Sequence, residues 1–344
     1  MRRVKLGQIC EVVSGGTPKT NVEEYWNGEF NWITPAEIND NDYIISDTKR
    51  KITQLAIEKK KLPLLPKGTV LLSSRAPIGK VAITGKEMYC NQGFKNLICS
   101  DEICNEYLYW YLKSKKEYLN SLGRGATFKE ISKKIVENIE IKLPEIERQR
   151  KIVDKLKKVD KIIQRRKNQS RLLDVVVQAR FVEMFGDPII NNMSWPESTI
   201  GDGCFVTKLA GFEYSKYIEY DDTGDVVMVK AQNVKNGTLN RKDLSFISNE
   251  VSDALPRSQL LPGDVVMTYV GANIGDVALI DDKYKYHLAP NVAKIRVDAK
   301  IYNSVYFMYM LMFLNSYIVK NSADTAKAAL GMERIRKLKH SCNS

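Results

Sequence analysis

The chain has 344 residues, enough for two or three domains that each bury a core of their own. Its contents of 44% hydrophobic and 27% charged residues are ordinary for a soluble globular protein. The formal net charge of +12 is not ordinary, and it favours a polyanionic partner, most often nucleic acid. A merely soluble basic surface is the alternative that charge alone leaves open.

Export, membrane insertion and zinc binding are disfavoured. The N-terminus carries Arg2 and Arg3 but no long apolar segment, so it is not typical of a signal peptide. The most apolar run, Val305–Leu314, is too short to span a bilayer and predicts a buried helix. The cysteines form no Cys-x-x-Cys pair and there are only two histidines, so we predict no metal site. We expect a cytoplasmic protein with reduced thiols and no membrane partner.

The first part of the chain, up to Pro144, reads as short strands, loops and helices. The predicted elements, in chain order, are a loop at 15–18, a strand and turn at 31–38, two strands within 64–83 around a turn at 73–77, a strand at 90–99, a helix at 106–120, a loop at 123–127, and a short helix and strand within 128–143. This mixture predicts an α+β domain.

A long helix is predicted next, over Glu145–Met184, because this stretch has no internal Pro or Gly and is followed by Gly186. About 40 residues would make a helix of about 60 Å. A 4-3-4-3 spacing, typical of a coiled-coil seam, links Ile152, Leu156, Val159, Ile163, Arg166, Ser170, Leu173, Val177, Arg180 and Met184. Such a narrow apolar stripe needs a partner helix; a core helix of a large domain is the alternative.

After Pro188 the same order of elements restarts. Leu65–Ile83 aligns without a gap with residues 261–279, with 8 identities in 19 positions, and pairs Val70 with Val266. An internal repeat of this length indicates two copies of one domain. The fold class is therefore predicted as α+β, with two homologous domains joined by a long coiled-coil-type helix. The predicted boundaries are 1–144, 145–186 and 187–344.

No catalytic motif stands in either copy. Gly79 and Gly85-Lys86 have the wrong spacing for a phosphate-binding loop, and Glu87 replaces the hydroxyl that would hold Mg²⁺. A dinucleotide fingerprint, a His-Glu-x-x-His motif and a Gly-x-Ser-x-Gly elbow are all missing. The sequence therefore predicts a binding or scaffolding protein; chemistry within the chain is the disfavoured alternative.

Three stretches carry a resemblance to a known family. They are LPEIERQRKIV (Leu143–Val153), FVEMFGDP (Phe181–Pro188) and the repeated strand–turn–strand of residues 64–83 and 260–279. Together they resemble the specificity (S) subunit of type I restriction–modification systems, over essentially the whole chain. The resemblance implies two target recognition domains, each of which reads one half of a split double-stranded DNA site. It implies that the central helix acts as a spacer and docks methyltransferase (M) subunits.

The same resemblance implies a non-catalytic chain with no cofactor of its own. Methylation and cleavage would belong to the M and restriction (R) subunits, and S-adenosylmethionine, ATP and Mg²⁺ are expected there. The family also has a second conserved helix, which packs on the first, and this sequence reaches Ser344 without one. We therefore expect the seam to be covered by a second copy, a separate S fragment or the M subunit. The alternative is a truncated or silent S-like protein that binds M without sequence readout.

The subunit-docking residues predicted on the helix are Ile152, Leu156, Val159, Ile163, Arg166, Ser170, Leu173, Val177 and Met184, with Arg166 and Ser170 setting the register. The helix also holds twelve Lys or Arg and six Asp or Glu. Its net charge is therefore +6, half of the chain's net charge of +12. These charges either follow phosphates or form a solvated helix face.

Base reading is expected from loops of each recognition domain, because Arg prefers guanine edges whereas Asn and Gln prefer adenine. The candidates in the first domain are Thr17, Lys19, Ser73, Ser74, Arg75, Lys80 and Lys95. Those in the second are Lys230, Gln232, Asn233, Lys235, Tyr269 and Asn273. A plain surface or turn role is the alternative for each. The two sets differ in residue type, which predicts two different half-sites.

Overall fold

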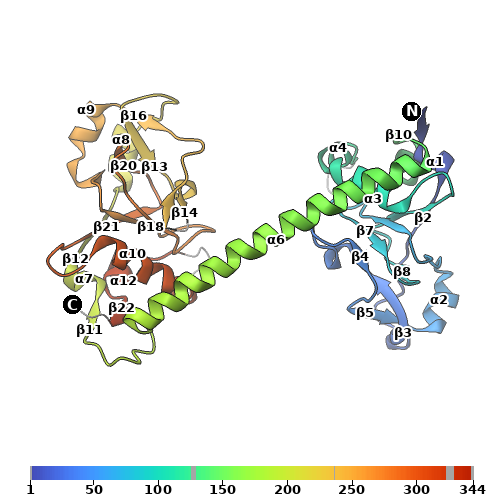
Figure 1. Cartoon of the computed structure of the whole chain (residues 1–344), viewed down its shortest axis with the longest axis horizontal. Coiled ribbons are helices and arrows are strands. Elements are labelled where there is room, and N and C mark those ends of the chain that lie inside the picture. Colours follow the sequence, from blue (N-terminus) through green and yellow to red (C-terminus); the bar gives the residue numbers. More distant parts are fainter. Residues whose placement is uncertain (1, 125–128, 236, 323–328, 342–344) are drawn as a thin grey trace. The chain divides into compact units, whose positions relative to one another are not determined.

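The computed structural model describes residues 2–124, 129–235, 237–322 and 329–341. The chain forms two compact units, residues 1–168 and 169–344, and the boundary lies inside the helix α6 (Ile146–Phe185). Figure 1 shows α6 as one continuous helix. The fold is α+β with a long central helix, as the sequence predicted, and α6 begins and ends one residue later than expected. The three-part division into domains stays a prediction.

Unit 1 is built on a sheet in the order β2-β9-β6-β7-β4, beside a smaller sheet in the order β5-β3-β8. The strands are β1 (Arg2–Lys5), β2 (Cys10–Ser14), β3 (Trp26–Ile33), β4 (Ile44–Ile45), β5 (Arg50–Ile52), β6 (Val70–Leu72), β7 (Val81–Thr84), β8 (Tyr89–Cys90), β9 (Lys95–Cys99) and β10 (Glu140–Leu143). The helices are α1 (Leu6–Ile9), η1 (Glu23–Tyr25), η2 (Pro35–Glu37), α2 (Gln54–Lys60), α3 (Asn105–Ser114), α4 (Lys116–Ser121) and α5 (Lys133–Glu137). The sequence predicted a single helix over 106–120, and this prediction is wrong. Two helices are present, because α3 ends at Ser114 and α4 begins at Lys116.

The start of α6 is fastened to unit 1 by a buried amide. The Gln149 side chain accepts a hydrogen bond from the Cys104 N–H at 2.8 Å and donates to the carbonyls of Glu102 and Pro144, each at 2.9 Å. Val153, one turn further on, is buried. Since an unpaired buried amide is costly, these three bonds fix the direction in which α6 leaves the domain. This accounts for the position of the LPEIERQRKIV stretch.

Unit 2 contains two four-stranded sheets, in the orders β12-β21-β18-β19 and β16-β13-β20-β17. Its strands are β11 (Glu197–Thr199), β12 (Cys204–Lys208), β13 (Val226–Val229), β14 (Val234–Lys235), β15 (Thr238–Leu239), β16 (Phe246–Ile247), β17 (Gln259–Leu260), β18 (Val265–Thr268), β19 (Val277–Leu279), β20 (Lys285–Leu288), β21 (Val292–Val297) and β22 (Lys339–Ser341). Its helices are α7 (Ile200–Gly203), α8 (Gly211–Tyr217), η3 (Ala231–Asn233), α9 (Asn249–Ala254), η4 (Pro256–Ser258), α10 (Ser304–Phe313), α11 (Asn315–Ser322) and α12 (Met332–Arg336). The apolar run at 305–314 is helical, as predicted, and Phe307 and Leu311 are buried.

The two units share a sheet order, since β2-β9-β6-β7 corresponds to β12-β21-β18-β19. The turn between the last two strands differs. Gly79 donates to the Ser73 carbonyl at 3.1 Å, whereas Gly275 donates to the Thr268 carbonyl at 2.8 Å, so the turn of unit 2 is one residue longer. The gapless alignment of the repeats is therefore wrong before the turn and right after it. The inserted residue was not visible in the sequence alignment, because identical residues stand at the same offset on both sides of the turn.

Lys294 is a buried ammonium on β21. Its Nζ donates to the carbonyls of Arg257 at 2.6 Å and Gln259 at 2.8 Å. Burial lowers the pKa of Lys294 from 10.5 to about 8.

This shift predicts how the stability of unit 2 depends on pH. Below about pH 8 Lys294 is charged in both states, and the desolvation cost is fully present. Between about pH 8 and 10 Lys294 binds more protons in the unfolded state than in the folded state, so its own contribution to the free energy of unfolding rises with pH. Lys294→Met is expected to remove this contribution and make the pH slope of stability less positive, as measured by urea unfolding between about pH 7.5 and 9.5, below the range in which tyrosines titrate. An identical slope in the variant would contradict this assignment.

Candidate nucleic-acid interface

Loops that are distant in sequence meet in unit 1. Gly16 donates to the Cys90 carbonyl at 2.9 Å, and Ser74 donates to the Gly93 carbonyl at 2.8 Å. The Lys80 ammonium donates to the Pro35 carbonyl at 3.0 Å. These bonds bring together the loop signals at 15–18, 34–38 and 73–77 with the segment before β9. A cluster of loops on a rigid sheet is the usual place for recognition residues.

A carboxylate joins two of the predicted cations in this cluster. Glu130 accepts from Arg75 Nε at 2.9 Å and from Lys95 Nζ at 3.1 Å. The Arg75 side chain is 46% exposed, whereas that of Lys95 is only 9% exposed. Partial burial acts to raise the pKa of Glu130, but the hydrogen bonds from Lys95 and Arg75 outweigh it and hold that pKa below its usual range. Glu130 is therefore ionised at neutral pH.

The other predicted residues of unit 1 divide by burial. Lys19 is exposed, and Thr17 is half-buried with its hydroxyl bonded to the Gln92 side chain. Ser73 and Ser74 are fully buried, and the Ser73 hydroxyl donates to the Pro77 carbonyl at 2.8 Å. The two serines hold the turn together and do not reach solvent in this conformation, so we leave them and Lys95 out of the proposed contact surface.

The candidates of unit 2 divide in the same way. Gln232, Lys235 and Asn273 are exposed, whereas Asn233 is buried and donates to the carbonyls of Asn240 and Lys242. Two more are half-buried. Lys230 donates to the Ser245 hydroxyl at 2.8 Å, and the ring of Tyr269 lies 5.3 Å from the Lys208 ammonium. The exposed residues, with Tyr269, remain candidate contacts, and Asn233 is a turn-holding residue.

Glu130 is a residue of this candidate cluster that sequence reasoning missed. It lies 35 positions after Lys95 and 55 after Arg75, so no local pattern links the three. A usable signal is chemical: a carboxylate follows an Arg-bearing Gly-rich loop in a strongly basic chain. Arg124 and Glu130 close that loop through mutual backbone hydrogen bonds of 3.0 Å. Gly125, Ala126 and Thr127 of the predicted loop lie outside the described residues.

The predicted docking seam on α6 is largely exposed. In unit 1 Ile152 and Leu156 are half-buried, whereas Val159 is 52% exposed and Ile163 is 46% exposed. In unit 2 Leu173 is 65% exposed, and Val177 and Met184 are also exposed, as are Arg166 in unit 1 and Ser170 in unit 2. Further exposed apolar residues, which the heptad pattern missed, are Ile162, Leu172, Val175 and Val176. The apolar surface of the helix is therefore wider than a coiled-coil seam.

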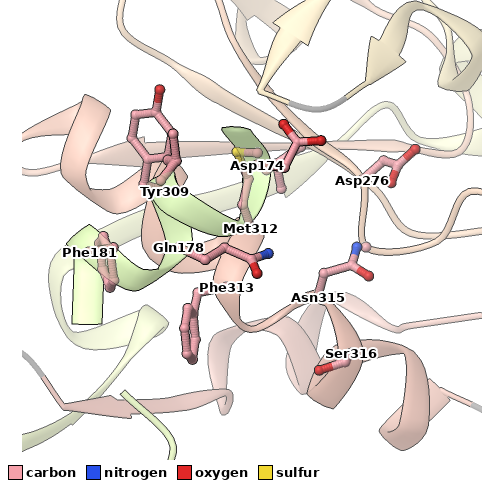
Figure 2. A pocket seen from close by; sticks show the side chains of 12 residues that line it. Asp174, Gln178, Phe181, Asp276, Tyr309, Met312, Phe313, Asn315 and Ser316 are labelled. Carbon is pink, nitrogen blue, oxygen red and sulfur yellow. The ribbon is translucent and has the colours of Figure 1, made fainter. Parts of the chain in front are cut away.

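Unit 2 also has a cavity of about 480 Å³ between α6, α10, α11 and the turn before β19. Figure 2 shows side chains from these elements around it. They are Asp174, Val177, Gln178, Phe181, Gly275, Asp276, Val277, Tyr309, Met312, Phe313, Asn315 and Ser316. Burial raises the pKa of Asp276. Because the lining has two carboxylates and no Lys or Arg, this cavity does not suit a phosphate and lies outside the candidate nucleic-acid surface.

Three further findings concern the described part of the chain. Among those residues, no group of three or more His, Cys, Asp or Glu is placed to hold a metal ion. The cysteines that are described, Cys10, Cys90, Cys99, Cys104 and Cys204, are all free thiols. In the same ranges, no helix combines the length and apolar character needed to cross a membrane.

Comparison with known sequences finds one family of similar proteins. The type I restriction modification DNA specificity domain matches residues 1–170. The chain is 41% identical over 186 residues to the type I restriction enzyme MjaIX specificity subunit of Methanocaldococcus jannaschii, which covers 53% of this chain and 43% of that protein. It is 24% identical over 323 residues to the MjaVIII specificity subunit of the same organism, which covers 90% and 74%. The match thus spans less than half the length of the MjaIX subunit.

Solved structures share the fold. The S subunit of a type I restriction–modification system from M. genitalium aligns with a TM-score of 0.52 at 14% identity, over 98% of this chain and 83% of that one. A chain from work on complex assembly and conformational transition of the type I system aligns with a TM-score of 0.55 at 18% identity, over 98% and 84%. The sequence match and the shared fold agree with the resemblance carried by the two ends of α6. Residues 1–170 thus match the type I restriction modification DNA specificity domain, and the chain as a whole is similar to the specificity subunits of type I restriction–modification systems.

Proposed function

We propose that this chain is the DNA-binding specificity subunit of a type I restriction–modification complex, and that it recognises a bipartite double-stranded DNA site. The proposed readers are the two recognition domains, residues 1–144 and 187–344. The observation that carries the proposal is the specificity-domain match over residues 1–170. The relatives are named specificity subunits, and we place methylation and cleavage, with S-adenosylmethionine, ATP and Mg²⁺, on the M and R subunits.

Differences between the two loop sets support two unlike half-sites. Unit 1 presents the exposed cations Lys19 and Arg75, whereas unit 2 presents the amides Gln232 and Asn273 beside Lys235. A guanidinium matches the acceptor pair of guanine, whereas an amide matches the donor and acceptor of adenine. We therefore expect the first half-site to include a guanine and the second to include an adenine.

The exposed apolar residues of α6 support a docking role. Leu173, Val176 and Val177 are each at least 46% exposed, and a contiguous apolar surface of this kind marks a protein interface. We propose that an M subunit covers it in the cytoplasmic complex, and that R subunits join through M. A second copy of the chain or a separate S fragment is the competing occupant.

The test is a binding selection on randomised duplex DNA with the chain and its M subunit together. A selected bipartite motif supports the proposal. Binding that falls steeply with salt but selects no motif would favour the silent S-like alternative, since phosphate contacts alone give affinity without sequence. Methyl transfer by the purified chain alone would overturn the assignment of chemistry to its partners.

A further inference from the structure

Arg75 and Glu130 occupy a piece of backbone that recurs in both units. They face each other in an antiparallel bridge, and the corresponding bridge in unit 2 joins Val270 and Ala329. In each unit the residue after the second partner donates its N–H to the carbonyl of the residue before the first, at 2.9 Å in unit 1 and 2.8 Å in unit 2. The scaffold is shared, but only unit 1 places a cation and an anion on it. The ion pair is therefore an addition to the fold and not a requirement of it.

The ion pair leaves one end of the guanidinium available. Arg75 uses Nε to bond the Glu130 carboxylate, and within the described residues no partner is found for its Nη1 or Nη2. A guanidinium carries five N–H donors in one plane. With Nε anchored, the two Nη groups remain to meet a pair of acceptors that lie side by side. The 46% exposure of the side chain leaves room for such a ligand.

Lys95 keeps the anchor ionised. Its ammonium, nearly buried, bonds the second oxygen of Glu130 at 3.1 Å and lies 3.5 Å from the Ser74 hydroxyl. The backbone bonds between Glu130 and Arg124 fix the main chain that carries this carboxylate. Because both oxygens are engaged, the carboxylate cannot turn away from Arg75 without breaking a charged hydrogen bond. The guanidinium is thus held in one orientation before any ligand arrives.

The chemistry of the site favours a neutral acceptor pair over a phosphate. A phosphate at the Nη groups would lie close to the Glu130 carboxylate, and that repulsion would weaken the contact. The O6 and N7 atoms of guanine are neutral acceptors at the spacing that a guanidinium spans in the major groove. We propose that Glu130 is a positioning residue that holds Arg75 for bidentate contact with one guanine in the half-site read by unit 1. This inference rests on the proposed DNA-binding function.

The experiment compares variants of the full chain, each assembled with the M subunit, in the same duplex selection. Arg75→Ala is expected to remove the preference for guanine at one position of one half-site, a loss of about 5- to 150-fold. Glu130→Gln keeps the shape of the side chain but loses its charge. It is expected to reduce the preference for guanine at that same position at least several-fold and to leave the preferences in the other half-site unchanged. Glu137→Gln is the matched control, because it removes the same charge from a carboxylate that pairs with Lys133 in the same unit.

A second variant tests whether the contact depends on the shape of the guanidinium or only on its charge. Arg75→Lys keeps the charge but cannot make two parallel bonds, so it is expected to retain affinity and lose the guanine preference. If Arg75→Ala removes the preference for guanine but Glu130→Gln leaves that preference intact, the positioning role of Glu130 is overturned. Equal tightening on all sequences in Glu130→Gln would also overturn it, since that indicates a phosphate contact.

Two outcomes separate this inference from the proposed function. If the wild type selects a bipartite motif that neither Arg75→Ala nor Glu130→Gln alters, the inference fails and the function stands. If the wild type with M selects no motif, the proposed function fails and takes the inference with it.

Discussion

Leu173→Asp is expected to abolish stable association with the M subunit while the chain itself stays folded. Leu173 is 65% exposed, so the substitution costs the isolated chain little. In an interface the carboxylate would be desolvated without a partner, which costs several kcal/mol and corresponds to a loss of affinity of at least about 100-fold. Co-purification and calorimetric titration with the M subunit measure this effect.

Asn168→Asp is the matched control for this substitution. It adds the same charge to an exposed position of the same helix, outside the predicted docking residues. We expect it to bind M within a few-fold of the wild type. Unchanged affinity in Leu173→Asp would show that M does not cover this part of α6. Loss of self-association in place of M binding would identify a second copy of the chain as the occupant.

Phe181→Ala is expected to lower the free energy of unfolding of unit 2 by about 3–5 kcal/mol. Phe181 is 8% exposed and stacks on Tyr306 of α10 with ring centroids 5.6 Å apart. Phe313 also stacks on Phe181, with ring centroids 6.0 Å apart, and Phe185 packs on Tyr306 at 4.8 Å. Truncation would remove packing where the end of α6 meets α10 and would enlarge the pocket that Phe181 lines in Figure 2. Hydrogen exchange of the full chain, resolved by unit, measures the loss.

Met184→Ala serves as the control, because Met184 lies on the same turn region of α6 but is 50% exposed. It is expected to change the stability of unit 2 by less than about 0.5 kcal/mol. If Phe181→Ala changes the free energy of unfolding of unit 2 as little as Met184→Ala, the aromatic contacts are not what holds the end of α6 to unit 2. The expected contrast gives a physical reason for the FVEMFGDP stretch: its two phenylalanines join the helix to the rest of unit 2.

The sequence alone determined the long helix and the duplication, and both follow from local rules. The lack of Pro and Gly between Glu145 and Met184, with Pro144 and Gly186 outside, predicted α6 to within one residue at each end. The repeated apolar pattern predicted two domains of one fold, because the same spacing of apolar residues predicts the same strands in each half of the chain. The family resemblance rested on the same stretches, at the two ends of α6 and in the repeat.

Burial of single polar residues required the tertiary structure. Ser73 stands at the start of a predicted turn and Asn233 ends the short helix η3, positions where small polar side chains are usually exposed, yet both are buried and bond to nearby backbone. The extra residue in the second turn was likewise visible only from the hydrogen bonds that close each turn. The sequence predicts that a turn is present but does not determine which of its side chains are buried against the core.

The ion pair at the proposed reading site also belongs to the tertiary structure. Arg75, Lys95 and Glu130 come from a turn, a strand and the segment after a loop, and only the sheet brings them within 3.1 Å. The sequence determined that unit 1 carries an arginine in a turn between paired strands. The packed fold decided that a carboxylate would hold it, because contacts between distant segments are set by how the strands align and not by any local pattern.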